Sequence, residues 1–159
     1  DMSIVYHQFL PEFEPLPGER YSTVLVSVDM FQKSGVTLEK LHDTALKVTK
    51  QALPAELKQD KDIFYVATNY LKQFGSAAML DMEFMEETAE KFNENFYIIP
   101  CLRDIIQIAA ESSIEAEKLY ELLRGWNAKL KEIEVLSDHI YLYDRKKKQI
   151  EIVNAQPTG

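Results

Sequence analysis

The chain has 159 residues, of which 46% are hydrophobic, and 18 Lys and Arg stand against 26 Asp and Glu for a formal net charge of -8. This length supports one sizeable hydrophobic core and is short for two, so we expect a single domain over residues 1–159. The negative charge repels phosphate backbones and anionic lipids, and it therefore disfavours direct nucleic-acid binding.

The only cysteine, Cys101, excludes an internal disulfide and any multi-cysteine metal site. A lone thiol is typical of a reducing compartment, so we expect a cytoplasmic protein. No run reaches the roughly eighteen apolar residues of a membrane helix, and no secretion signal is visible at the start. The chain begins at Asp1 rather than at a methionine, and we expect it to be a fragment of a longer chain.

The first third of the chain predicts two strands and two helices. Residues 3–10 are expected to form a strand that ends in the proline-rich segment 11–18, and the β-branched residues 22–28 a second one. Asp29 is the expected N-cap of a short helix closed by Gly35. Thr37 is the expected N-cap of an amphipathic helix, because apolar residues then recur at helical spacing as far as Pro54.

The middle of the chain predicts a polar linker over residues 56–62, a strand over 63–68 and a short apolar strand over 77–80. Asp81 is the expected N-cap of the next helix, with acidic residues in its first turns. Two more strands are expected over 96–100 and 105–109, with a break at Pro100.

The last third predicts the longest helix and a hairpin. Ser112 and Glu115 have the spacing of a capping box, and an apolar stripe follows as far as residue 133. Two strands, residues 139–143 and 150–153, are joined by a polar turn, which is a hairpin pattern.

Taken in order, these elements form strand, strand, helix three times, followed by a hairpin. The pattern predicts an α+β fold of repeated strand-strand-helix units, with a mainly antiparallel sheet backed by helices on one face and a C-terminal β-hairpin. A sheet split into two packed halves fits the same alternation.

Residues 96–100, 105–108 and 135–145 resemble a bacterial family defined by a domain of unknown function, numbered 5688 and typical of gut anaerobic Firmicutes. Residues 3–6, 23–26 and 77–80 fall where similar proteins have strands, so the resemblance covers nearly the whole chain. It implies an additional N-terminal segment in many members and no assigned activity. Similar proteins tend to have serine at the position of Cys101, which implies that this thiol is not essential.

The triplet Ser137-Asp138-His139 contains the residue types of a hydrolytic triad, but triad members normally converge from separate parts of a chain. We therefore expect these residues to organise a turn, with His139 opening a strand. Cys101 is expected to be a small packed residue rather than a nucleophile. No catalytic residue is predicted.

The sequence also predicts no cofactor and no metal site. Its three histidines are scattered without ligand spacing, and the glutamates of residues 83–90 are expected to form an exposed helix face. Glycine-rich phosphate loops and dinucleotide-binding motifs are absent from the sequence.

The basic run 145–148 is expected at the tip of the hairpin, where its first role is solvation and its alternative role is contact with an acidic partner. The strand tyrosines are expected at the rim of the core, or in a groove if several share one sheet face. The candidate binding residues are accordingly Arg145, Lys146, Lys147, Lys148, Asp138, His139, Tyr141 and Tyr143.

Three functions remain open at this level. The residues favour a non-enzymatic interaction domain with a protein partner, because no catalytic group of side chains stands out. The first alternative is a small-ligand-binding or enzymatic domain whose site is assembled from distant residues such as Asp104, Asp138 and His139 with strand tyrosines. The second is an acidic inhibitor of a nucleic-acid-binding complex.

Overall fold

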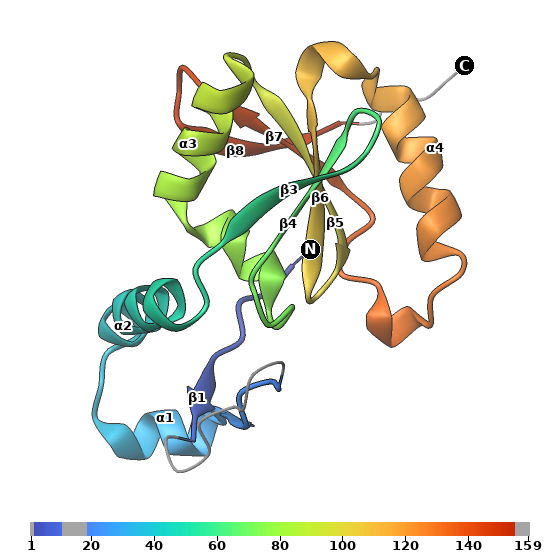
Figure 1. Ribbon diagram of the computed structural model, residues 1–159. Helices are drawn as coiled ribbons and strands as arrows, with labels where there is room; N and C mark the ends of the chain where they lie inside the picture. The colour runs from blue at the N-terminus through green and yellow to red at the C-terminus, as the bar shows by residue number, and fades with distance from the viewer. Residues whose placement is uncertain (1, 11–18, 155–159) are drawn as a thin grey trace.

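The computed structural model describes residues 2–10 and 19–154, and its centre is a six-stranded antiparallel sheet (Figure 1). In spatial order the strands are β3 (Glu56–Lys61), β4 (Phe64–Thr68), β6 (Ile105–Ala110), β5 (Phe96–Leu102), β7 (Ile140–Asp144) and β8 (Gln149–Val153). The predicted α+β class and the C-terminal strand pair β7–β8 are confirmed.

The helices α3 (Met82–Phe92) and α4 (Ala116–Asn127) cover opposite faces of this sheet (Figure 1). Within β5, Phe96 and Ile98 belong to the core on the α3 side, and Tyr97 and Ile99 belong to the core on the α4 side with Leu119. The expectation of helices on one face is therefore wrong. Residues 96–101 are all buried, a continuous buried run typical of a strand covered on both faces.

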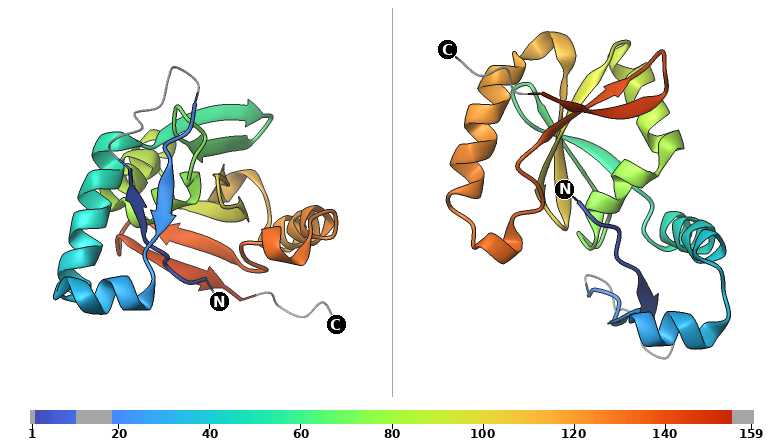
Figure 2. Two further views of the ribbon diagram at one scale, coloured as in Figure 1. Left: turned by 90° about the horizontal axis from the view of Figure 1, so that it is seen from below. Right: turned by 180° about the vertical axis from the view of Figure 1, so that it is seen from behind.

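The N-terminal lobe, residues 2–10 and 19–52, lies at one end of the sheet (Figure 2). It contains β1 (His7–Phe9) and β2 (Thr23–Leu25), which pair in a separate two-stranded sheet, followed by α1 (Val28–Ser34) and α2 (Leu38–Ala52). Among the described residues, none before Leu53 is buried. The lobe thus contributes surface rather than core.

Several local predictions are confirmed by cap geometry. The Thr37 side chain accepts a hydrogen bond from the Lys40 amide at the start of α2, and Asp81 accepts one from the Phe84 amide at the start of α3. Gly35 ends α1 in the left-handed region, at φ 68°. These caps depend on the side chain or backbone freedom of one residue, which is why the local sequence predicts them.

Other predictions are wrong because a partner distant in sequence decides the structure. The polar segment 56–62 forms the edge strand β3 rather than a linker, since charged residues suit a strand with one open side. Ser112 does not cap α4, because its amide and hydroxyl both donate to the Glu94 carboxylate; Ser112 lies in the short 3-10 helix η2 (Glu111–Ser113), and Glu115 is the N-cap residue of α4.

The predicted apolar strand over residues 77–80 is instead part of a 3-10 helix, η1 (Gly75–Leu80). Phe74 has a left-handed backbone, with φ 54°, which turns the chain out of an extended path before η1 begins. Pro100 lies inside β5 rather than ending it, at the point where the β5–β6 register is irregular. A missing N–H is tolerated at such an irregularity.

Two predicted boundaries also shift. Ser27, not Asp29, is the N-cap of α1, because its hydroxyl accepts from the Met30 amide while Asp29 pairs with Lys33 inside the helix. The predicted apolar stripe to residue 133 is too long: α4 ends at Asn127, and the short 3-10 helix η3 (Glu132–Glu134) follows.

Candidate functional site

A groove of about 880 Å³ lies between the N-terminal lobe and the sheet. Residues 2–9 run through it, α2 forms one wall, and η1 with β8 forms the other. Its size lies in the upper part of the range of about 300–1,000 Å³ that is usual for small-molecule sites. The groove therefore has the dimensions of a binding site.

Apolar side chains form most of the lining of the groove. Leu41, Ala45 and Val48 face it from α2, at the helical spacing that the sequence shows, and Met79 and Ile150 line it from η1 and β8. Val48 is still 39% exposed. The apolar stripe of α2 thus covers this space only in part, and solvent contacts apolar surface there.

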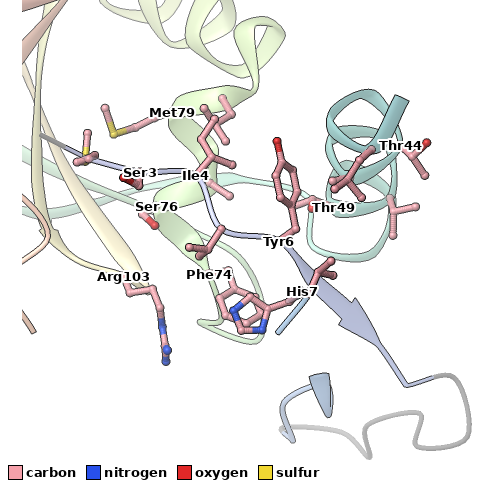
Figure 3. A pocket seen from close by; sticks show the side chains of 18 of the residues that line it. Ser3, Ile4, Tyr6, His7, Thr44, Thr49, Phe74, Ser76, Met79 and Arg103 are labelled. Atoms are coloured by element: carbon pink, nitrogen blue, oxygen red, sulfur yellow. The ribbon is translucent and has the colours of Figure 1, made fainter. Parts of the chain in front are cut away.

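A cluster of three side chains defines the polar end of the groove (Figure 3). The rings of His7 and Phe74 lie side by side with centroids 4.7 Å apart, and the guanidinium carbon of Arg103 lies 5.5 Å from the Phe74 centroid. His7 Nδ1 is 3.1 Å from the Thr23 hydroxyl oxygen. Partial burial and the adjacent Arg103 charge lower the pKa of His7, so its neutral form is favoured.

The carboxylate of Asp104 fixes the position of Phe74 and Arg103 within this cluster. One carboxylate oxygen accepts from the Phe74 amide at 3.0 Å and lies 3.3 Å from Arg103 Nε, and the other lies 2.9 Å from an Nη atom of Arg20. Partial burial acts to raise the pKa of Asp104, but the Phe74 amide and the two arginines outweigh it and the pKa is lowered. Asp104 therefore remains ionised and holds Arg103 beside Phe74.

The loop before Phe74 attaches the lobe to the sheet. The buried amide side chain of Gln73 accepts from the Tyr21 amide at 2.8 Å and donates to the Tyr21 carbonyl at 2.9 Å. The buried Asn69 side chain in turn accepts from the Gln73 amide and donates to its carbonyl. These bonds join the segment just before β2 to the loop that carries Phe74, and they therefore attach the lobe to the sheet.

The side chains of three of the four predicted basic residues at the hairpin tip, Arg145, Lys147 and Lys148, contact nearby residues. Arg145 donates to the carbonyl and side chain of Asn93, Lys147 pairs with Asp144 and Glu151, and Lys148 pairs with Glu86. Part of the charge of the tip is therefore balanced within the domain. Binding of a partner at this tip stays a prediction.

The other four predicted binding residues lie at the start of β7 and within it. Asp138 accepts a hydrogen bond from the Asn127 side chain, and His139 directly precedes the strand, as expected for a turn. Tyr141 and Tyr143 are buried, with Tyr143 stacked on Phe96. The five residues of β7 span about 17 Å, so Asp138 and the hairpin tip are far apart. Of the eight candidates, Tyr141 lines the groove.

Cys101 is buried, as predicted, and burial raises the pKa of its thiol to about 12. A thiol with such a pKa is protonated near neutral pH and is a poor nucleophile. Within residues 2–10 and 19–154, no group of three or more His, Cys, Asp or Glu side chains is placed to hold a metal ion. In the same described ranges, no helix has the length and apolar character needed to cross a membrane.

Sequence reasoning missed the cluster of His7, Phe74 and Arg103. These residues come from three segments that no local pattern connects, and a strand histidine or a turn arginine has no signature of its own. Asp104 was expected among the residues of a distant-residue site, but with Asp138 and His139, which do not line the groove. The one available signal was the apolar stripe of α2, which predicts that something packs against that helix.

A comparison with protein-family models matches residues 56–145 to the family described as "Family of unknown function (DUF5688)". The matched segment starts at the first residue of β3 and ends just after β7. Searches of curated proteins and of solved structures found no match. The matched segment includes Phe74 and Arg103, whereas α2 and residues 2–9 precede it.

Proposed function

We propose that this chain, which belongs to the DUF5688 family of unknown function, is a non-enzymatic binding domain. Its ligand is an apolar molecule, and the binding site is the groove between the N-terminal lobe and the sheet. The observation that carries the proposal is the groove itself: about 880 Å³ lined largely by apolar side chains. Apolar surface that stays in contact with water makes the burial of an apolar ligand favourable, by about 25 cal/mol per Å².

The chemistry of the lining supports binding rather than catalysis. Among the described residues that line the groove, none is Asp, Glu, Cys or Lys, so no carboxylate there can orient His7 as a general acid or base. The lone thiol, Cys101, belongs to the core on the α4 side of the sheet. We also infer a reducing compartment such as the cytoplasm from this single thiol, and a source among gut anaerobic Firmicutes from the resemblance.

A fluorescence titration with N-phenyl-1-naphthylamine, a neutral apolar probe, tests the proposal. We expect saturable binding at one site. Ala45→Trp places a large side chain in the groove from α2 and should weaken binding roughly tenfold or more. Gln51→Trp is the matched control, because Gln51 is exposed on the same helix and does not line the groove. Absence of saturable binding, or equal binding by both variants, would contradict the proposal.

The second candidate function is docking of a protein partner, which the outer surface of the lobe favours. Val28, Leu38 and Leu25 are 71%, 59% and 54% exposed and do not line the groove. Exposed apolar side chains that form a contiguous patch are typical of interaction surfaces, and these three come from consecutive elements, β2, α1 and α2. If a partner docks there, Leu38→Glu should abolish its capture, and reversing the charges of residues 145–148 should not. The opposite result would favour the hairpin tip.

A further inference from the structure

We propose that the ligand of the groove is an amphipathic carboxylate, whose alkyl chain lies along α2 and whose carboxylate binds the guanidinium of Arg103. This inference rests on the proposed function and specifies its ligand class.

The charge of the lining is opposite to that of the chain. The sequence has an excess of eight acidic residues, yet the described lining residues include no Asp or Glu and one permanent cation, Arg103. Arg20, Arg103 and Asp104 together carry one net positive charge beside the groove. A single negative charge on the ligand would therefore be neutralised at this position.

The guanidinium of Arg103 is held in place while part of it stays available. Its Nε atom lies 3.3 Å from Asp104 and its plane is near the Phe74 ring, which restricts its rotation. Among the described residues, its two Nη groups have no hydrogen-bond or ion-pair partner, and its side chain is 64% exposed. Two parallel N–H groups at the end of a fixed guanidinium match the two oxygens of a carboxylate.

A smaller cavity next to the groove, which shares Thr49, Leu53 and Phe74 with its lining, provides an internal comparison. It has a volume of about 330 Å³, and its charged lining residues are two lysines, Lys47 and Lys50, and two carboxylates, Asp81 and Glu83, with which Lys50 pairs. The charges of these four lining residues therefore sum to zero. The larger groove combines an available cation with an apolar channel, which is the pairing that an amphipathic anion requires.

The test is displacement of N-phenyl-1-naphthylamine by decanoate and by 1-decanol, which share an alkyl chain and differ in the charge of the head group. We expect decanoate to bind more tightly than decanol. Arg103→Gln should raise the decanoate Kd about tenfold, the low end for a charge-assisted hydrogen bond, and leave the decanol Kd unchanged. Unchanged decanol binding also reports that the variant is folded.

Arg124→Gln is the matched control, because Arg124 is an exposed arginine of α4 that does not line the groove. It should leave both Kd values within about twofold of the wild-type values. The inference is overturned if Arg103→Gln weakens decanol and decanoate equally, or if decanoate is insensitive to it while decanol and the probe still bind. If neither the probe nor either chain binds, the proposed function fails as well.

Discussion

The sharpest test of this structure is the substitution Gly75→Ala at the start of η1, where the wall of the groove meets the β5–β6 turn. A Cβ atom at Gly75 would lie 2.1 Å from the Asp104 carbonyl oxygen and 2.7 Å from the Thr68 hydroxyl oxygen. The first contact is about 1.3 Å shorter than the 3.4 Å at which ordinary contact begins. Two of the atoms nearest to the new methyl group belong to the Asp104 backbone, so the chain itself must move.

The expected loss of stability follows from what that movement breaks. Overpacking in a core costs about 1–3 kcal/mol, and displacing Asp104 also weakens its hydrogen bond from the Phe74 amide, a charge-assisted bond worth about 1.5–3 kcal/mol. We expect Gly75→Ala to lower the free energy of unfolding by about 3–5 kcal/mol, a large part of the roughly 5–15 kcal/mol of a typical domain. In urea denaturation this corresponds to a midpoint lower by about 2 M.

Gly125→Ala is the matched control. Gly125 lies in α4, is exposed, and has no atom within 4 Å of an added Cβ. Replacing a helical glycine at such a position with alanine should raise the free energy of unfolding by up to about 1 kcal/mol. The reasoning is refuted if Gly75→Ala unfolds at the wild-type urea concentration or above it.

Two further predictions concern the thiol and the histidine. Cys101→Ser should change the free energy of unfolding, measured by urea denaturation, by no more than about 1 kcal/mol. The thiol of the folded wild-type protein should react only slowly with a disulfide reagent at pH 8, because its pKa is raised to about 12. Rapid labelling of the folded protein would contradict this second prediction. The pKa of His7 is lowered in the folded protein, so the unfolded chain binds a proton at the His7 side chain more readily than the folded protein does. The contribution of His7 to stability is therefore present above pH 6.5 and declines as the pH falls below that value. Between pH 7.5 and 5.5, His7→Gln should therefore lose less stability in urea than the wild type does, and an equal or larger loss would exclude this role of His7.

The elements that the sequence predicts correctly are those whose cause is local. The N-caps Thr37 and Asp81 need one side chain and the next three amides, and the β7–β8 hairpin needs alternation on both sides of a polar turn. The errors arise where a distant partner competes for the same groups. Glu94 binds both polar groups of Ser112, so the apparent capping box never forms.

The groove shows a second limit of local reasoning. Its polar end joins His7 from β1, Phe74 from the loop before η1 and Arg103 from the β5–β6 turn, and its position depends on Asp104. Each of these residues alone is unremarkable in the sequence. The register of β4, β5 and β6 brings Phe74 and Arg103 together, and that register is decided by the packing of the whole sheet.

The absence of buried residues before Leu53 in the described chain has a thermodynamic consequence for the groove. A segment with few buried apolar contacts opens at a lower free energy than the core does, so we expect the lobe to open and exchange its amide hydrogens while the sheet stays folded. The wall that belongs to the sheet side then keeps its position, whereas the wall that belongs to the lobe is in equilibrium between an open and a closed position. A ligand that contacts both walls binds the closed form, and its apparent affinity is reduced by the fraction of molecules that are open. Affinity in such a site is governed as much by the stability of lobe closure as by the contacts of the ligand.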